Sequence, residues 1–205
     1  MTVLDTTSSR GRLLQSARQL FAENGYEGTS TASIARMAAT SESQLIKHFG
    51  GKAGLLEAVF VTGWNEVLPR IKASLTQETS ALEKLRRIPR AFGDALEATP
   101  DLRVLVLLEG RRIRKEGRQM TLTDGFTGYV ELLDEILTEL ETTGVLRPSL
   151  SKEAVRSAIV GMTEGALRDR VLAERTKHSP YTAEQLGQVV DALISAITLR
   201  SAAAA

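Results

Sequence analysis

Side chains suited to nucleic-acid contacts fall close together in one short segment of the chain. Four of them lie within six residues: Ser43, Gln44, Lys47 and His48. Hydroxyl, amide and imidazole groups hydrogen-bond to base edges, and a lysine ammonium binds phosphate oxygens. At these spacings the four side chains share the outward side of one helix. The segment therefore predicts a helix that reads a nucleic-acid groove.

A short helix is expected immediately before this polar helix. Thr29 and Ser30 are suited to cap its N-terminus, because their hydroxyls accept hydrogen bonds from unpaired backbone N–H groups. Its inward side is formed by Ile34, Ala35 and Ala38. Because Ala35 is small, the second helix can cross closely over the first.

The polar helix begins after a predicted turn at residues 39–41. Ser41 is its predicted cap, and Glu42 follows in the first turn, where a carboxylate complements the helix dipole. Leu45 and Phe49, four residues apart, hold the helix to the core. Two short helices around a tight turn form a helix-turn-helix, whose second helix enters the DNA major groove. An ordinary pair of amphipathic helices with a solvated face would give the same pattern, so the residues alone leave that alternative open.

At these positions the sequence resembles the tetracycline-repressor (TetR) family of bacterial transcription regulators. The likeness continues in residues 12–26, as the family's first helix, and in residues 55–59, as the start of its fourth. Residues 144–148 and the helices after them resemble the family's C-terminal half. The places of the family motif are held here by Thr29, Ser30, Ile34, Ala35, Ser41, Leu45, Ile46, Phe49 and Lys52.

The sequence departs from the family pattern at the turn and on the polar helix. Ala39 and Thr40 stand where the family usually has Gly and Val. Ile46 replaces a Tyr that commonly touches phosphate, and Ala53 replaces an acidic residue. A positive φ at the turn would strain Ala39 by about 1 kcal/mol relative to Gly. We expect these departures to change the set of DNA contacts without removing the fold.

The resemblance implies an all-α protein of about nine helices. Residues 1–52 would form a three-helix, helix-turn-helix DNA-binding domain, and residues 53–205 a larger helical domain for ligand binding and dimerisation. The implied function is a ligand-responsive repressor that binds double-stranded DNA at a palindromic operator. It would act as a homodimer and be released by a small-molecule effector, whose identity the sequence does not give.

Specific DNA contacts are expected from both short helices and from the start of the fourth. Gln44 is the predicted base reader, because its amide pairs well with adenine. Lys52 follows Gly50-Gly51 at a predicted helix start, where a bound phosphate would explain a cation, although a solvated lysine is the alternative. The predicted DNA-binding residues are Ser30, Thr31, Ser43, Gln44, Lys47, His48 and Lys52.

The resemblance implies dimerisation through the last two helices. Gly161 and Gly165 lie four residues apart in a predicted long helix and permit close approach of another helix. The last helix carries an apolar stripe over residues 186–197 that is wider than a monomer's helix usually needs. The predicted interface comprises Ala158, Gly161, Gly165, Leu186, Val189, Val190, Leu193 and Ile197.

The resemblance implies an effector cavity among the middle helices. The predicted lining is Trp64, Phe92, Met120, Phe126, Tyr129 and Met162, although such scattered residues are also typical of an ordinary core. The basic run at residues 111–118 would suit an anionic ligand or a second DNA contact, with a solvated loop as the alternative.

Composition agrees with an all-helical regulator and argues against other classes. Of the 205 residues 42% are apolar and 4% aromatic, and there is no cysteine, hence no disulfide and no thiolate metal site. Net charge is +1, and residues 1–52 carry six bases and four acids. No signal peptide or membrane span is predicted, so we expect a cytoplasmic protein.

Two other function classes remain beside the regulator. An enzyme would need a nucleophile–base pair, paired carboxylates or metal-ligand spacing, and the sequence offers none of these patterns. We therefore expect no catalysis, no metal and no cofactor. The second alternative is a helical interaction or small-molecule-binding protein that has lost DNA binding.

Overall fold

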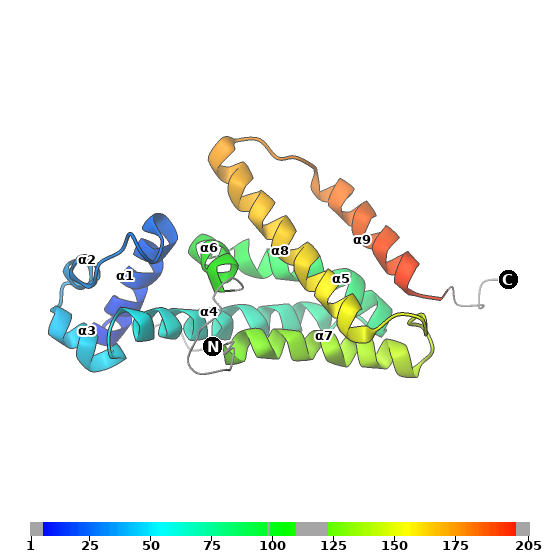
Figure 1. The fold of residues 1–205 in the computed structure, drawn as a ribbon, viewed down its shortest axis with the longest axis horizontal. Coiled ribbons are helices and arrows are strands. Elements are labelled where there is room, and N and C mark those ends of the chain that lie inside the picture. The colour runs from blue at the N-terminus through cyan, green and yellow to red at the C-terminus, as the bar shows by residue number, and fades with distance from the viewer. Residues whose placement is uncertain (1–5, 98, 110–122, 200–205) are drawn as a thin grey trace. The chain divides into compact units, whose positions relative to one another are not determined.

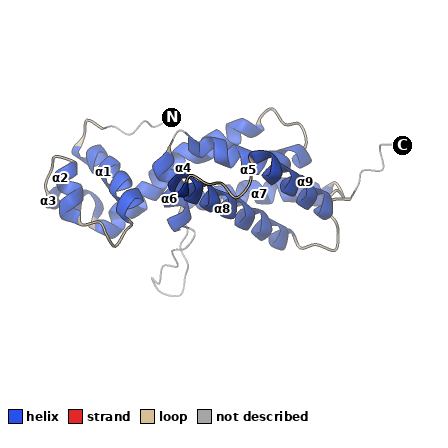
Figure 2. Ribbon diagram, turned by 90° about the horizontal axis from the view of Figure 1, so that it is seen from above, coloured by secondary structure: helices blue, strands red, loops and turns tan. Residues whose placement is uncertain are grey.

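The computed structural model describes residues 6–97, 99–109 and 123–199. Regular structure in these ranges is helical (Figure 2). The one β-type pairing within them is an isolated antiparallel bridge between Leu146 and Thr198. The all-α prediction is confirmed. The helices are α1 (Ser9–Asn24), α2 (Thr31–Met37), α3 (Glu42–Phe49), α4 (Lys52–Leu75), α5 (Ala81–Glu97), α6 (Pro100–Glu109), α7 (Asp124–Thr142), α8 (Lys152–Thr176) and α9 (Ala183–Ile197) (Figure 1).

By its internal contacts the chain forms two compact units. Unit 1 comprises Met1–Leu68 and Leu96–Phe126, and unit 2 comprises Pro69–Ala95 and Thr127–Ala205. The division falls inside α4, which continues past Pro69 to Leu75. The functional boundary after residue 52 remains a prediction.

Short polar side chains cap the helices of both units. Ser8 accepts a hydrogen bond from the N–H of Gly11, which satisfies one of the donors left unpaired at the start of α1. Thr182 and Gln185 form a reciprocal capping box at the start of α9. Such local bonds explain where these helices begin.

The core of unit 1 is aliphatic with one aromatic pair. Leu13, Ile34 and Leu45 are fully buried and join α1, α2 and α3. Trp64 packs edge-to-face on Phe126 with ring centroids 5.8 Å apart. No side chain fits beside Trp64 at position 125, because a Cβ added there would overlap the indole. A glycine is therefore required where α7 begins.

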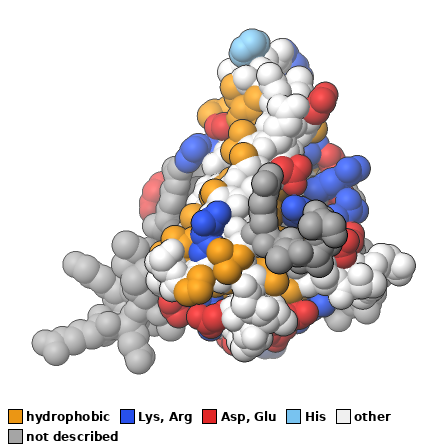
Figure 3. All heavy atoms as spheres, turned by 90° about the vertical axis from the view of Figure 1, so that its right-hand side faces the viewer, with side chains coloured by type: hydrophobic (Ala, Val, Ile, Leu, Met, Phe, Trp, Pro, Cys, Tyr) orange, Lys and Arg blue, Asp and Glu red, His pale blue; other side chains and the backbone are white. Residues whose placement is uncertain are grey.

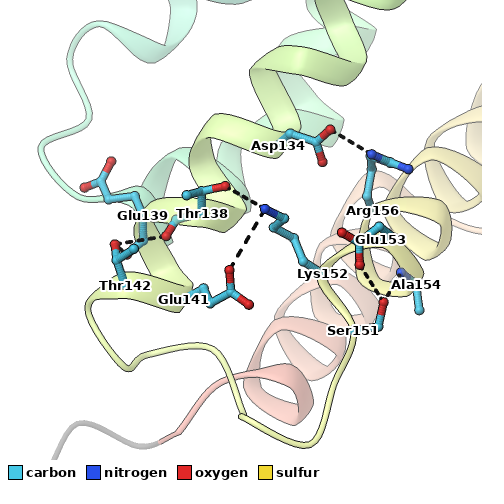
Figure 4. A network of polar contacts seen from close by, with 10 residues as sticks. All are labelled: Asp134, Thr138, Glu139, Glu141, Thr142, Ser151, Lys152, Glu153, Ala154 and Arg156. Carbon is cyan, nitrogen blue, oxygen red and sulfur yellow. Dashed lines mark hydrogen bonds and ion pairs between the residues drawn. The ribbon is translucent and has the colours of Figure 1, made fainter.

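In unit 2, polar contacts join α7 to α8 around an aliphatic seam. Arg156 donates to Asp134 at 2.7 Å, and Lys152 donates to Thr138 at 3.0 Å (Figure 4). Beneath these contacts α7 buries Leu133 and Leu137. Backbone groups of the turn after α7 also bond to the end of α9, where Arg147 donates to the carbonyl of Ile197 at 2.9 Å. Within the described ranges, no helix is long and apolar enough to cross a membrane.

Candidate nucleic-acid interface

The α2–turn–α3 segment is defined by its own backbone hydrogen bonds. Ser30 and Ser41 cap the two helices, accepting from the N–H groups of Ser33 and Gln44. Ala39 has φ +49°, in the left-handed region. The N–H of Ala39 donates to the carbonyl of Arg36 at 3.1 Å, and the N–H of Thr40 donates to the carbonyl of Ala35 at 3.0 Å. This pair of bonds is a Schellman motif that ends α2 and fixes the angle at which α3 departs.

The buried side of this segment matches the predicted one except at Phe49, which is half-buried. Ile34, Ala35, Ala38 and Leu45 are all buried, which holds α2 and α3 against α1. Thr29 does not cap α2. Its side chain is buried, and its hydroxyl lies within hydrogen-bonding distance of the carbonyls of residues 20 and 25. The loop before α2 is thereby tied to the end of α1.

The outward side of α3 carries the predicted base-reading residues. Ser43 and Lys47 are exposed, and Gln44 is half-buried beside them. His48 is also half-buried, and its Nε2 atom hydrogen-bonds to the hydroxyl of Ser9 in α1 at 3.1 Å. The arrangement leaves the hydroxyl, amide and ammonium groups of the first three residues on one accessible side of the helix. The imidazole of His48 lies at the edge of this accessible side, where its hydrogen bond to Ser9 of α1 positions it.

Two of the predicted phosphate-binding groups have partners inside the protein. Lys52 donates to the carbonyls of Tyr26 and Thr29 at 2.9 and 3.0 Å, and its Nζ lies 4.2 Å from the Tyr26 ring centroid. The hydroxyl of Thr31 donates to Glu42 at 2.6 Å. Lys52 therefore ties the start of α4 to the α1–α2 loop. The carboxylate of Glu42 stands beside the predicted phosphate site at Thr31.

Two arginines of α1 hold the helix-turn-helix to its surroundings. Arg12 donates to the carbonyl of Ala38 at 3.0 Å, which places a cation at the negative end of α2. Arg18 pairs with Glu66 of α4 at 3.2 Å and with Asp101 of α6 at 3.9 Å. No pattern in the sequence predicts these pairings, since the partners are far apart in the chain.

Comparison with known proteins decides between the helix-turn-helix and an ordinary helix pair. Residues 13–59 match the family described as "Bacterial regulatory proteins, tetR family", and residues 60–196 match "YsiA-like protein, C-terminal region". The chain belongs to the tetR family. It is a DNA-binding transcription regulator, and the interpretation of α2 and α3 as a helix-turn-helix is confirmed.

Relatives of this tetR-family chain are similar over most of their length. The fatty acid metabolism regulator protein of Bacillus subtilis is 24% identical over 80% of this chain and 84% of its own. The structure of FadR from Bacillus subtilis in complex with stearoyl-CoA has a TM-score of 0.74 at 24% identity and covers 91% of this chain and 98% of its own. The ketosteroid regulator KstR2 of Mycobacterium tuberculosis has a TM-score of 0.69 at 24% identity, covering 97% of this chain and 100% of its own. At these identities the two structures show a shared fold.

A second candidate site of this tetR-family regulator is a cavity within unit 2. It has a volume of about 600 Å³ and lies between α5, α8 and α9. Phe92, Leu167 and Val190 contribute apolar walls. Arg86 and Arg90 line it as well, and each lies near an aspartate, Asp191 at 3.6 Å and Asp94 at 3.8 Å. Sequence reasoning missed these arginines, because a pair spaced four residues apart on α5 reads as an ordinary solvated helix face.

The aromatic residues predicted to line one cavity are divided between the units. Phe92 lines the cavity and contacts Tyr129, and the centroids of their two rings are 5.2 Å apart. The hydroxyl of Tyr129 lies beside Thr163. Burial raises the pKa of Tyr129. Trp64 and Phe126 lie in unit 1, packed on each other. Met162 is half-buried on α8 away from the cavity lining, while Met120 and the basic run at residues 111–118 lie outside the described residues.

The predicted dimer-interface residues fall on two sides of α8 and α9. Val190 and Ile197 are buried within unit 2, whereas Val189 is 58% exposed. A Cβ added at Gly161 would meet nothing within 4 Å, and one at Gly165 would meet only the side chain of Arg168. Ala158 is exposed, and Leu186 and Leu193 are half-buried. Hydrophobic side chains also form a line among charged ones on the face seen in Figure 3.

Proposed function

We propose that the chain is a repressor that binds a palindromic operator as a homodimer and is released by an amphipathic small molecule. The observation that carries the DNA-binding part is the outward side of α3, where Ser43, Gln44 and Lys47 stand accessible on a capped helix. Two such helices in a dimer would enter successive major grooves about 34–36 Å apart. The proposed function is binding alone, without catalysis.

Each DNA-facing residue has a distinct proposed role. Gln44 reads a base through its amide, and Ser43 and Lys47 add contacts to bases and phosphates. Ser30, Thr31, His48 and Lys52 contact the backbone, and Thr31 can donate to a phosphate only by giving up its hydrogen bond to Glu42. Because Lys52 already donates to two carbonyls, only its remaining N–H is available to a phosphate.

The proposed dimer uses the open side of α8 and the exposed side of α9. Gly161 and Gly165 have space in front of them that this protomer does not fill, so a helix from a second copy could approach closely. The exposed Val189 would be covered by the same contact. Support also comes from the family, whose regulators bind operators typically as homodimers.

The proposed effector is a molecule with a long apolar chain and an anionic end. A cavity of about 600 Å³ is within the usual size of small-molecule sites. Its apolar walls suit an acyl chain, and Arg86 and Arg90 can exchange their exposed aspartate partners for a ligand anion. The relatives named above include a fatty acid metabolism regulator and a structure with stearoyl-CoA, which supports a fatty acyl thioester.

The experiment that tests the DNA-binding proposal is selection of duplexes from a random pool by the purified protein, followed by measured affinities. We expect a palindrome with half-sites about one helical turn apart. Gln44→Ala should weaken binding to it by about 1–3 kcal/mol and relax the preference at one base pair. An unchanged preference would refute the role of Gln44. Failure to retain any duplex at low salt would favour the alternative, an interaction protein that has lost DNA binding.

The effector proposal has its own test. Stearoyl-CoA should raise the midpoint of thermal unfolding and lower operator affinity, while coenzyme A alone should do neither. Leu167→Trp would fill part of the cavity and should abolish the response while operator binding persists. Stabilisation by stearoyl-CoA without any loss of operator affinity would contradict release, since a ligand shifts an equilibrium only by binding two states differently.

A further inference from the structure

The most exposed large apolar side chain among the described residues stands on the recognition helix. Ile46 is 59% exposed, compared with 58% for Val189 on α9. Single exposed hydrophobic residues are ordinary on protein surfaces, so the exposure alone assigns no role. The position of Ile46 on α3 does, because the side chain shares its accessible side with the residues proposed to read bases.

Helix geometry places Ile46 next to Ser43. Residues three apart are neighbours on a helix surface, and the rise between them is about 4.5 Å. This is close to the spacing of one base step, about 3.4 Å along a DNA strand. Leu45, the preceding residue, is fully buried, which fixes the orientation of the helix and keeps Ile46 outward. A duplex that brings its base edges to Ser43 therefore also brings them to Ile46.

The major groove offers one kind of apolar group at the base edges, the C5-methyl of thymine. A branched aliphatic side chain without hydrogen-bonding atoms can recognise that methyl and cannot satisfy the donors and acceptors of other bases. We propose that Ile46 is a specificity-determining residue that contacts a thymine C5-methyl in each operator half-site. This inference rests on the proposed DNA-reading function of α3.

The test removes the methyl and the side chain separately. In the selected operator, each thymine of both half-sites is replaced in turn by deoxyuridine, which lacks only the C5-methyl. Dissociation constants are measured by fluorescence anisotropy at one fixed salt concentration. We expect one such thymine in each half-site. Replacing it in one half-site should weaken binding about fourfold, which corresponds to the free energy of burying one methyl group.

The variant Ile46→Ala should bind the thymine operator about as weakly as the unchanged protein binds the deoxyuridine operator, and should not distinguish the two. Ile46 is 59% exposed, so the variant should keep its fold, which far-UV circular dichroism checks. Val61→Ala is the matched control, because Val61 is an exposed aliphatic residue of α4, at 40%. This control should retain the full effect of deoxyuridine.

The outcomes separate this inference from the function on which it rests. Operator binding that is insensitive to deoxyuridine at every position overturns the role of Ile46 and leaves the regulator intact. The same conclusion follows if Ile46→Ala loses affinity yet still distinguishes thymine from deoxyuridine, since its contact would then be with the sugar–phosphate backbone. Failure to bind any duplex would overturn both.

Discussion

The substitution Ala39→Gly should stabilise the protein. Ala39 occupies the left-handed position that follows the last turn of α2, with φ +49°. A side chain in this region costs about 1–2 kcal/mol relative to ordinary backbone, whereas glycine adopts it freely. Glycine also gains conformational entropy in the unfolded chain, which offsets part of that difference. The net expected gain in the free energy of unfolding is about 1 kcal/mol.

Gly144 provides the control, because the reverse substitution can be made there at the same kind of helix end. After α7, Gly144 has φ +70°. Its N–H donates to the carbonyl of Glu141 and the N–H of Val145 donates to that of Leu140, which is again a Schellman motif. A Cβ at position 144 would meet nothing within 4 Å, so Gly144→Ala tests the backbone cost alone. We expect it to lose about 1 kcal/mol, equal in size and opposite in sign.

Thermal and urea unfolding, followed by far-UV circular dichroism, measure both variants. Because dimerisation makes the midpoint depend on concentration, all samples need the same protein concentration. Ala39→Gly should raise Tm by about 2–4 °C, and Gly144→Ala should lower it by a similar amount. If Gly144→Ala destabilises while Ala39→Gly has no effect or destabilises, the reasoning about strain at the turn is wrong.

Three further predictions follow from burial, charge and open space. Burial raises the pKa of Tyr129 above about 10, so its contribution to stability should be complete below pH 10 and fall by about 1.4 kcal/mol per pH unit above it. Urea unfolding between pH 8 and 11 should show a smaller alkaline loss in Tyr129→Phe, and an identical loss would contradict this. Arg10, Arg36 and Lys47 are exposed in the DNA-binding part of the chain. If each binds one phosphate in both protomers of a dimer, the slope of log affinity against log salt should be about −5. A slope near zero would exclude these phosphate contacts. Gly161→Arg should convert the dimer to a folded monomer by light scattering, because its space is open within one protomer; an unchanged dimer would place the interface elsewhere.

Much of the fold could be predicted from the sequence because helix ends are encoded locally. Ser30 and Ser41 cap α2 and α3 as predicted. The turn between these helices was expected at residues 39–41, where Ala39 has a left-handed backbone. Each of these features depends on a few neighbouring residues, which a sequence displays directly.

The partners of the charged side chains could not be predicted in the same way. Lys52 bonds to carbonyls more than twenty residues before it, and Arg12 reaches the end of α2. Such pairings depend on how helices cross, which periodicity does not specify. The apolar stripe of α9 was visible as a pattern, but only the packing divides it into the buried Val190 and the exposed Val189.

The hydrogen bond between Thr31 and Glu42 bears on how the regulator searches a genome. It holds a carboxylate at the start of α3, on the surface proposed to face DNA. This charge repels phosphates, and on random sequence few base contacts compensate, so we expect such complexes to dissociate quickly. At the operator the proposed base contacts would outweigh the same repulsion. We therefore expect the fixed acidic group to shorten the time needed to locate one site among many.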